Sequence, residues 1–256
     1  TVTGRNVQAV DVTAETVGAT SVAGGSIMNL NRTGAAPVVG QNVELTVASL
    51  TRTGTGTLDV IRNTGTGAGF GGGQKLLVAA GGPVPVNGMT TPWLVQTNGT
   101  QSDFVTYDAT VPAGTFTTGL AATAKVSATG ATTLGDNPVI LALRTAANIS
   151  NSGTFNTVTI QNSGLITENV AITLQPNFVF NDGTAANEGL IYVRGNTTSI
   201  TGTVSANGLT KFGGGTLNLS AASPSLTGTV SVNQGVLQAF GPTTTSTYNV
   251  LGNGGV

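Results

Sequence analysis

Short apolar segments alternate with turns rich in glycine and asparagine along the whole chain, and this texture limits the fold more than any other feature. No window places apolar residues at helical spacing over three turns, whereas the abundant valine and threonine favour extended backbone. Strands are expected at 140–143, 155–160, 170–174, 178–180 and 190–193, with turns at 151–153, 162–164 and 181–183. The sequence therefore predicts an all-β protein with little helix.

Composition excludes several classes of protein. The chain has no Cys and no His, which removes disulfides, thiolate and imidazole metal sites, and His-dependent catalytic triads. The net charge is −1, whereas surfaces that bind nucleic acid or anionic membranes are basic. No run of 18 apolar residues is present, so no helical membrane span is expected in this segment. We also expect no metal ion, no cofactor and no enzymatic activity.

The charged residues are few and dispersed. They make up 7% of the chain and form no cluster in the sequence. Solvated positions, or positions at the edges of strands, are therefore expected for Arg62, Arg144, Arg194 and Lys211.

An internal repeat relates two distant segments. Residues 50–60 and 209–219 share the pattern Leu-Thr-basic-x-Gly-x-Gly-Thr-Leu-x-apolar. A shorter spacing follows the second copy, because Gly-Thr-Leu at 215–217 is matched 20 residues later by Gly-Val-Leu at 235–237. Short strands at such a period are typical of a β-solenoid, in which side chains alternate between the inside and the outside of stacked coils.

The solenoid hypothesis assigns regions and inward-facing positions. Residues 1–62 and 123–256 are predicted to form coils, the latter continuing toward further repeats. Residues 63–122 contain four of the prolines, which central ladders exclude, and are predicted to form an irregular insertion that packs on the side of the coils. The inward positions are expected at Leu58, Leu217, Leu219, Val230, Val232, and Val236 or Leu237.

The second copy of the repeat and the segment after it, 209–220 and 226–237, resemble the autotransporter-associated β-strand repeat of secreted proteins. Residues 50–67 are similar to a degenerate copy, and 75–110 resembles a segment found between such repeats. The resemblance implies a right-handed parallel β-helix passenger, located at or beyond the bacterial cell surface. It supplies no catalytic residues.

A stack of coils is a rod with unpaired strand edges at its ends, and such edges template further pairing unless they are capped. Neither end of the sequence carries a proline-rich stop, a charged cluster or an amphipathic helix. We therefore expect an extracellular structural protein that forms a rod, stalk or self-assembling fibre, with itself as its partner. Two alternatives stay open: an adhesin that binds surface glycans or other cells, and a polysaccharide-active β-helix enzyme.

The candidates for a glycan site lie in the predicted insertion. They are Trp93, Asp103, Tyr107 and Asp108, because carboxylates beside aromatic rings are typical of sugar-binding clefts. On an extended chain Asp103 and Asp108 would lie ~16 Å apart on opposite faces, so only a turn would bring them together. An adhesin would need an exposed platform of Trp93 and Tyr107.

Overall fold

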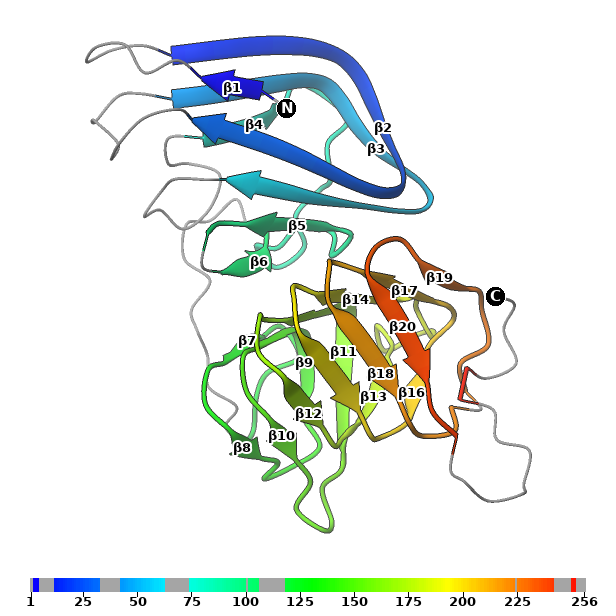
Figure 1. Cartoon of the computed structure of the whole chain (residues 1–256). Coiled ribbons are helices and arrows are strands. Elements are labelled where there is room, and N and C mark those ends of the chain that lie inside the picture. The colour runs from blue at the N-terminus through cyan, green and yellow to red at the C-terminus, as the bar shows by residue number, and fades with distance from the viewer. Residues whose placement is uncertain are drawn as a thin grey trace. The chain divides into compact units, whose positions relative to one another are not determined.

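The computed structural model is built from strands, with no helix in the described residues (Figure 1). The described residues are 2–4, 12–32, 42–62, 74–99, 101–105, 118–223, 225–241 and 250–251. Accordingly, this part of the chain holds no helix that is long and apolar enough to cross a membrane. The chain divides into two compact units, Thr1–Val111 and Pro112–Val256, and each is described by itself.

Unit 1 is built on two long strands that each bend back on themselves (Figure 1). Its strands are β1 (Val2–Gly4), β2 (Val12–Arg32), β3 (Asn42–Arg62), β4 (Gln74–Val78), β5 (Leu94–Thr97) and β6 (Ser102–Phe104). β2 and β3 have 21 residues each. They pair in parallel through both arms of the bend, from Val12 with Asn42 to Leu30 with Arg62. β1 pairs in parallel with the end of the second arm of β2.

The next turn of unit 1 continues both arms. β4 pairs in parallel with the first arm of β3, and β5 pairs in parallel with the second arm. Two strands of the region 63–122 therefore belong to the stack, which differs from the insertion that the sequence predicts. The physical reason is that Pro83, Pro85 and Pro92 lie in the connection between β4 and β5, where they interrupt no ladder. β6 returns antiparallel on β5.

Unit 2 consists of shorter strands stacked turn upon turn. Its strands are β7 (Lys125–Ala128), β8 (Thr132–Thr133), β9 (Val139–Thr145), β10 (Ile149–Ser150), β11 (Thr157–Thr167), β12 (Ile172–Leu174), β13 (Asn177–Phe180), β14 (Gly189–Val193), β15 (Thr197–Ile200), β16 (Val204–Ser205), β17 (Leu209–Phe212), β18 (Thr216–Leu219), β19 (Val230–Val232) and β20 (Val236–Ala239). One sheet runs β8-β10-β12-β15-β18-β20, and a second sheet holds the other eight strands. The pairs between these strands are parallel. This stacking is compatible with a β-solenoid.

The register of unit 2 aligns inward side chains into columns. Val126, Leu143, Leu165 and Ile191 are paired in sequence from β7 to β14, and each is at most 3% exposed. Burying an aliphatic side chain of this size stabilises the fold by roughly 1.5–3 kcal/mol. The columns therefore hold successive turns together.

Most of the predicted inward positions are buried. The buried ones are Leu58 (2% exposed), Leu217 (0%), Leu219 (1%) and Val230 (4%). Of the two alternatives in the last strand, Leu237 is inward, because it pairs with Leu217 and packs against the core. Val236 is 46% exposed. Val232 is 48% exposed although it pairs with the buried Lys211 of β17, so the predicted burial of this position is wrong.

Two of the three predicted turns are turns in the structure, and the third is a corner inside a strand. Residues 151–153 and 181–183 are turns, with positive φ at Gly153 (61°) and Gly183 (94°). Residues 162–164 instead lie inside β11, where Ser163 has φ 64° and the register against β9 shifts between Ile160 and Gly164. One residue in the left-handed region changes the direction of the strand without a loop.

Close stacking of the bends in unit 1 gives the first prediction. A Cβ atom at Gly56 would lie 2.0 Å from the carbonyl oxygen of Val22 on the neighbouring turn. We expect Gly56→Ala to lower the free energy of unfolding by about 2–3 kcal/mol, because backbone must move to accept the methyl group.

Gly18→Ala is the matched control, because nothing lies within 4 Å of a Cβ atom at Gly18. Its effect is expected to stay within about 0.5 kcal/mol. Urea unfolding followed by circular dichroism measures both variants. Equal midpoints for the two variants would contradict the close approach of the bends.

Candidate functional site

The structure describes two of the four glycan-site candidates. Trp93 is 7% exposed, so its ring offers no exposed platform. Asp103 lies in β6, where its Oδ1 accepts a hydrogen bond from the backbone N–H of Phe104 (2.9 Å) and its Oδ2 accepts one from Gln101 (3.4 Å). Tyr107 and Asp108 lie outside the described residues.

A buried lysine at a corner of unit 2 is the most unusual polar group that the structure describes. Lys211 on β17 pairs with Ile191 and so continues the column of Val126, Leu143 and Leu165. Its side chain is fully buried, which corrects the expected solvated position. A lysine occupies an aliphatic position of the column, and its charge must be compensated inside the protein.

Backbone carbonyls compensate this charge. The Lys211 ammonium donates hydrogen bonds to the carbonyl oxygens of Gly213 (2.5 Å), Gly215 (2.6 Å) and Gln234 (2.8 Å). Gly213 and Gly215 belong to the corner of its own turn, whereas Gln234 lies between β19 and β20 on the following turn. The three donors of the ammonium thus bind two successive turns.

Glycine makes room for the ammonium. Gly213 has φ 78° and Gly235 has φ 73°, a conformation that favours glycine. A Cβ atom at Gly235 would lie 2.3 Å from the Lys211 Nζ. The glycines of this corner are therefore required both by the backbone conformation and by the space that the lysine needs.

The first copy of the repeat shares one of these contacts in unit 1, at a half-buried arginine. Arg52 occupies the position of Lys211 in the shared pattern, and its Nε donates to the carbonyl oxygen of Gly56 at 2.7 Å. Gly56 corresponds to Gly215, and Gly54, with φ 56°, corresponds to Gly213. In both copies the basic residue caps the carbonyl of the second glycine. The spacing between the basic residue and the two glycines, which is the same in both copies, is the sequence feature from which this corner could have been predicted.

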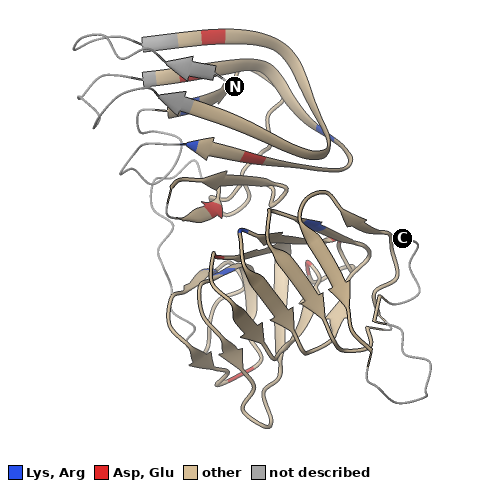
Figure 2. Ribbon diagram, viewed as in Figure 1, with Lys and Arg blue, Asp and Glu red and all other residues tan. Residues whose placement is uncertain are grey.

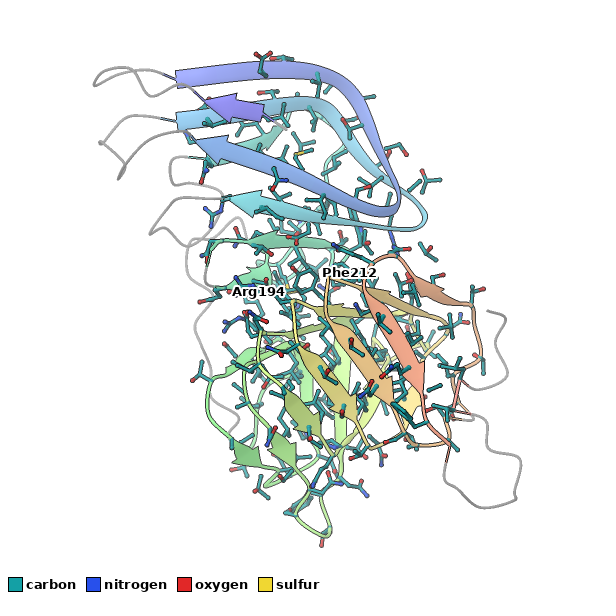
Figure 3. All side chains as sticks on the ribbon, in the orientation of Figure 1. Arg194 and Phe212 are labelled. Atoms are coloured by element: carbon teal, nitrogen blue, oxygen red, sulfur yellow. The ribbon has the colours of Figure 1, made fainter. Side chains whose placement is uncertain are left out.

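Burial lowers the pKa of Lys211 to about 8, because the enclosed ammonium loses its hydration. The carbonyl oxygens of the corner offset only part of this loss. Next to the corner, the rings of Phe212 (Figure 3) and Tyr192 on the neighbouring turn meet edge to face, with centroids 5.1 Å apart and an interplanar angle of 72°.

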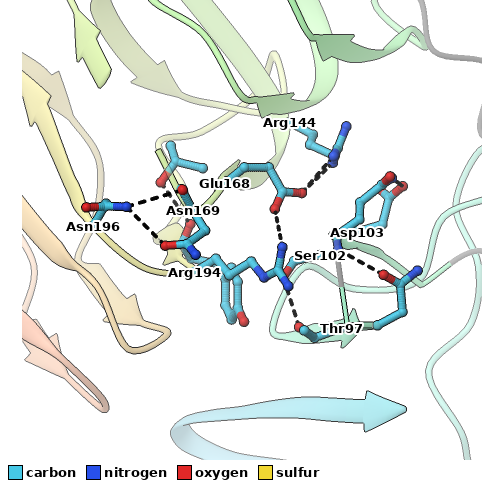
Figure 4. Close-up of polar contacts among 12 residues, drawn as sticks. Thr97, Ser102, Asp103, Arg144, Glu168, Asn169, Arg194 and Asn196 are labelled. Atoms are coloured by element: carbon cyan, nitrogen blue, oxygen red, sulfur yellow. Dashed lines mark hydrogen bonds and ion pairs between the residues drawn. The ribbon is translucent and has the colours of Figure 1, made fainter. Parts of the chain in front are cut away.

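A second buried polar group links turns of unit 2 through charge. Glu168 lies between two arginines (Figure 4): Oε1 is 2.7 Å from the Nη2 of Arg144, and Oε2 is 3.3 Å from the Nη1 of Arg194. Arg144 also donates to the Ser127 hydroxyl at 2.7 Å. Because Arg144 is 8% exposed, its expected solvated position is wrong. Arg62, which is 2% exposed, is likewise buried.

An asparagine pair stacks beside this charge network. The Asn196 amide donates to the backbone carbonyl and to the Oδ1 of Asn169, both at 3.2 Å (Figure 4). Asn196 itself has φ 55°, in the left-handed region that asparagine tolerates. Asparagine at equivalent corners thus satisfies backbone groups from one turn to the next.

The buried polar groups of unit 2 bind other residues of the protein and so hold its successive turns together. The described residues contain no group of three or more Asp or Glu side chains that would hold a metal ion. Lys211 is bound to carbonyls, and Glu168 is bound to two arginines. Comparison with known protein-family models, curated proteins and solved structures finds no match for the chain.

The buried lysine predicts a specific pH dependence. The unfolded chain keeps the ordinary lysine pKa near 10.5, and the folded chain has a pKa of about 8. Between these two values the unfolded state binds more protons, so the contribution of Lys211 to the free energy of unfolding rises with pH. We expect Lys211→Met to lose this rise, which amounts to about 1–3 kcal/mol, and to be destabilised at pH 7 because three carbonyls lose their donor.

Urea unfolding at pH 7.5, 8.5 and 9.5 measures the difference between the wild type and the variant. Lys75→Met is the control, because Lys75 pairs with Glu44 near the surface of unit 1. A wild-type pH profile in Lys211→Met would show that Lys211 does not carry the effect.

Proposed function

We propose that this chain is a structural part of an extracellular rod, stalk or self-assembling fibre at or beyond the bacterial cell surface. In this proposal its turns form a right-handed parallel β-helix. The observation that carries the proposal is that, within the part of the chain that the structure describes, no further strand covers the end of the inward column of unit 2. Val232 is 48% exposed at an inward position, and Leu237 is only half-buried.

The outermost strands support extension by a further strand. β19 and β20 pair on one side only, with β17 and β18, among the described residues. Natural proteins usually protect such edges with charged residues or proline. β19 reads Val-Ser-Val and β20 reads Val-Leu-Gln-Ala, with neither kind of protection.

Charge offers no barrier to stacking. Figure 2 shows the charged residues scattered over the strands, and the net charge is −1. Copies of a nearly neutral chain repel one another little, so apolar side chains such as Val232 and Phe240, which is 49% exposed, would decide whether ends associate. The buried Trp93 weakens the adhesin alternative, which needs an exposed aromatic platform.

A charge at the uncovered column tests the proposal. We expect the purified chain to form rods or filaments in negative-stain electron microscopy, and Val232→Lys to prevent them, because an ammonium at an inward position opposes burial by the next turn.

Val170→Lys is the matched control, because Val170 is also exposed (41%) but precedes β12 in the middle of the stack. It is expected to assemble as the wild type does. Compact particles of the wild type at every concentration, confirmed by sedimentation velocity, would overturn the proposal.

A further inference from the structure

A cavity of about 260 Å³ lies in unit 1, between the two arms of β2. The aliphatic side chains of Leu45 and Leu58 on β3 form part of its lining. Thr20, Ser21, Ser26 and Asn29 on β2 supply the polar part. No charged side chain lines it. Its volume is slightly below that of the smallest common ligand sites, which is about 300 Å³.

The register explains why the cavity exists. Thr20 of β2 pairs with Leu50 of β3, and Ser26 pairs with Leu58. At two inward positions where β3 has a leucine, β2 therefore has a small residue with a hydroxyl group. Leu50 and Leu58 are each 2% exposed. The shorter side chains of β2 leave space where the neighbouring turn has leucine.

The polar groups of the cavity are not all engaged within the protein. Ser21 shares a hydrogen bond with Thr53 at 2.7 Å, and Thr20 makes a long one to the carbonyl of Gly18 at 3.4 Å. Ser26 and Asn29 have no hydrogen-bonding partner for their side chains within the described residues. Because Ser26 pairs with the inward Leu58, its hydroxyl faces the partly apolar cavity, whereas Asn29 lies three residues further along the strand and so on the opposite face.

We propose that this cavity binds one neutral sugar ring. A pyranose carries hydroxyl groups for Ser26 and Thr20, both at inward positions of β2, and C–H faces for Leu45 and Leu58. The uncharged lining gives no partner to an acid or an amine, since a charge is costly away from water without a partner. Such a sugar site in unit 1 is independent of whether the chain forms the proposed rod.

The two methionines of the chain provide a direct readout. Met28 lines the cavity, whereas Met89 lies outside its lining and is 0% exposed. In a chain labelled with methyl-¹³C methionine, Met28 reports on the cavity and Met89 is an internal control. A ligand of about a dozen non-hydrogen atoms is expected to bind with a Kd of about 1 mM.

The full chain is titrated with the methyl glycosides of glucose, galactose and N-acetylglucosamine up to about 50 mM, well above that Kd. Methyl glucuronide and cyclohexylmethanol are the charged and the apolar comparison compounds. We expect at least one neutral glycoside to shift the Met28 signal saturably, with Met89 unchanged and with weaker shifts from both comparison compounds. A shift that is largest with cyclohexylmethanol, or no saturable shift with any glycoside, overturns the inference.

Two variants assign the binding to the cavity. Ser26→Leu introduces the residue that the neighbouring turn has at this register, so it is expected to fold and to lower the affinity at least tenfold. Thr16→Val, at an exposed position of the same strand, is expected to bind as the wild type does. Unchanged affinity in a folded Ser26→Leu variant, judged by the Met89 signal, contradicts the site.

A tetrasaccharide of the best-binding sugar distinguishes the sources of the ring. Tighter binding of the tetrasaccharide identifies a residue within a polysaccharide as the ligand. Equal binding identifies a free sugar or a terminal residue. Both results support a sugar site.

Discussion

The parallel ladder between successive turns is the constraint on which the rest of this structure depends. Because the strands of unit 2 pair in register with those of neighbouring turns, inward side chains are forced into columns such as Val126, Leu143, Leu165 and Ile191. A column is stable while every member is aliphatic and closely packed. Each polar inward residue must therefore find a partner in the turn itself or in a neighbouring turn.

The two units treat polar inward residues differently. In unit 2, Lys211 enters an aliphatic column, and its charge is met by carbonyls that the glycine corners turn toward it. In unit 1, Thr20 and Ser26 stand at positions where the neighbouring turn has leucine. Within the described residues, no set of backbone carbonyls surrounds them as it surrounds Lys211, and a cavity remains beside them. The difference follows from side-chain length, since a lysine reaches the corner backbone and a serine does not.

Much of the fold could be predicted from the sequence, because strand texture and the repeat both reflect the ladder. Leu58 and Leu217 point inward as the repeat pattern indicates. The buried site was missed because charged residues are usually solvated, and composition alone does not show which carbonyls surround Lys211. The extent of the stack near Pro83 was also missed, because a proline excludes a strand only at its own position and not in the strands that flank it.

The corner at Lys211 also constrains the turn that follows it. Lys211 is bound by the carbonyl of Gln234, so its corner is complete only when another turn follows. That turn must carry glycine 24 residues after the lysine, because a Cβ atom at Gly235 would lie 2.3 Å from the Nζ. A side chain at that position would therefore displace the ammonium from its carbonyls or move the following turn away. At this corner the lysine and the glycines therefore join two successive turns of unit 2.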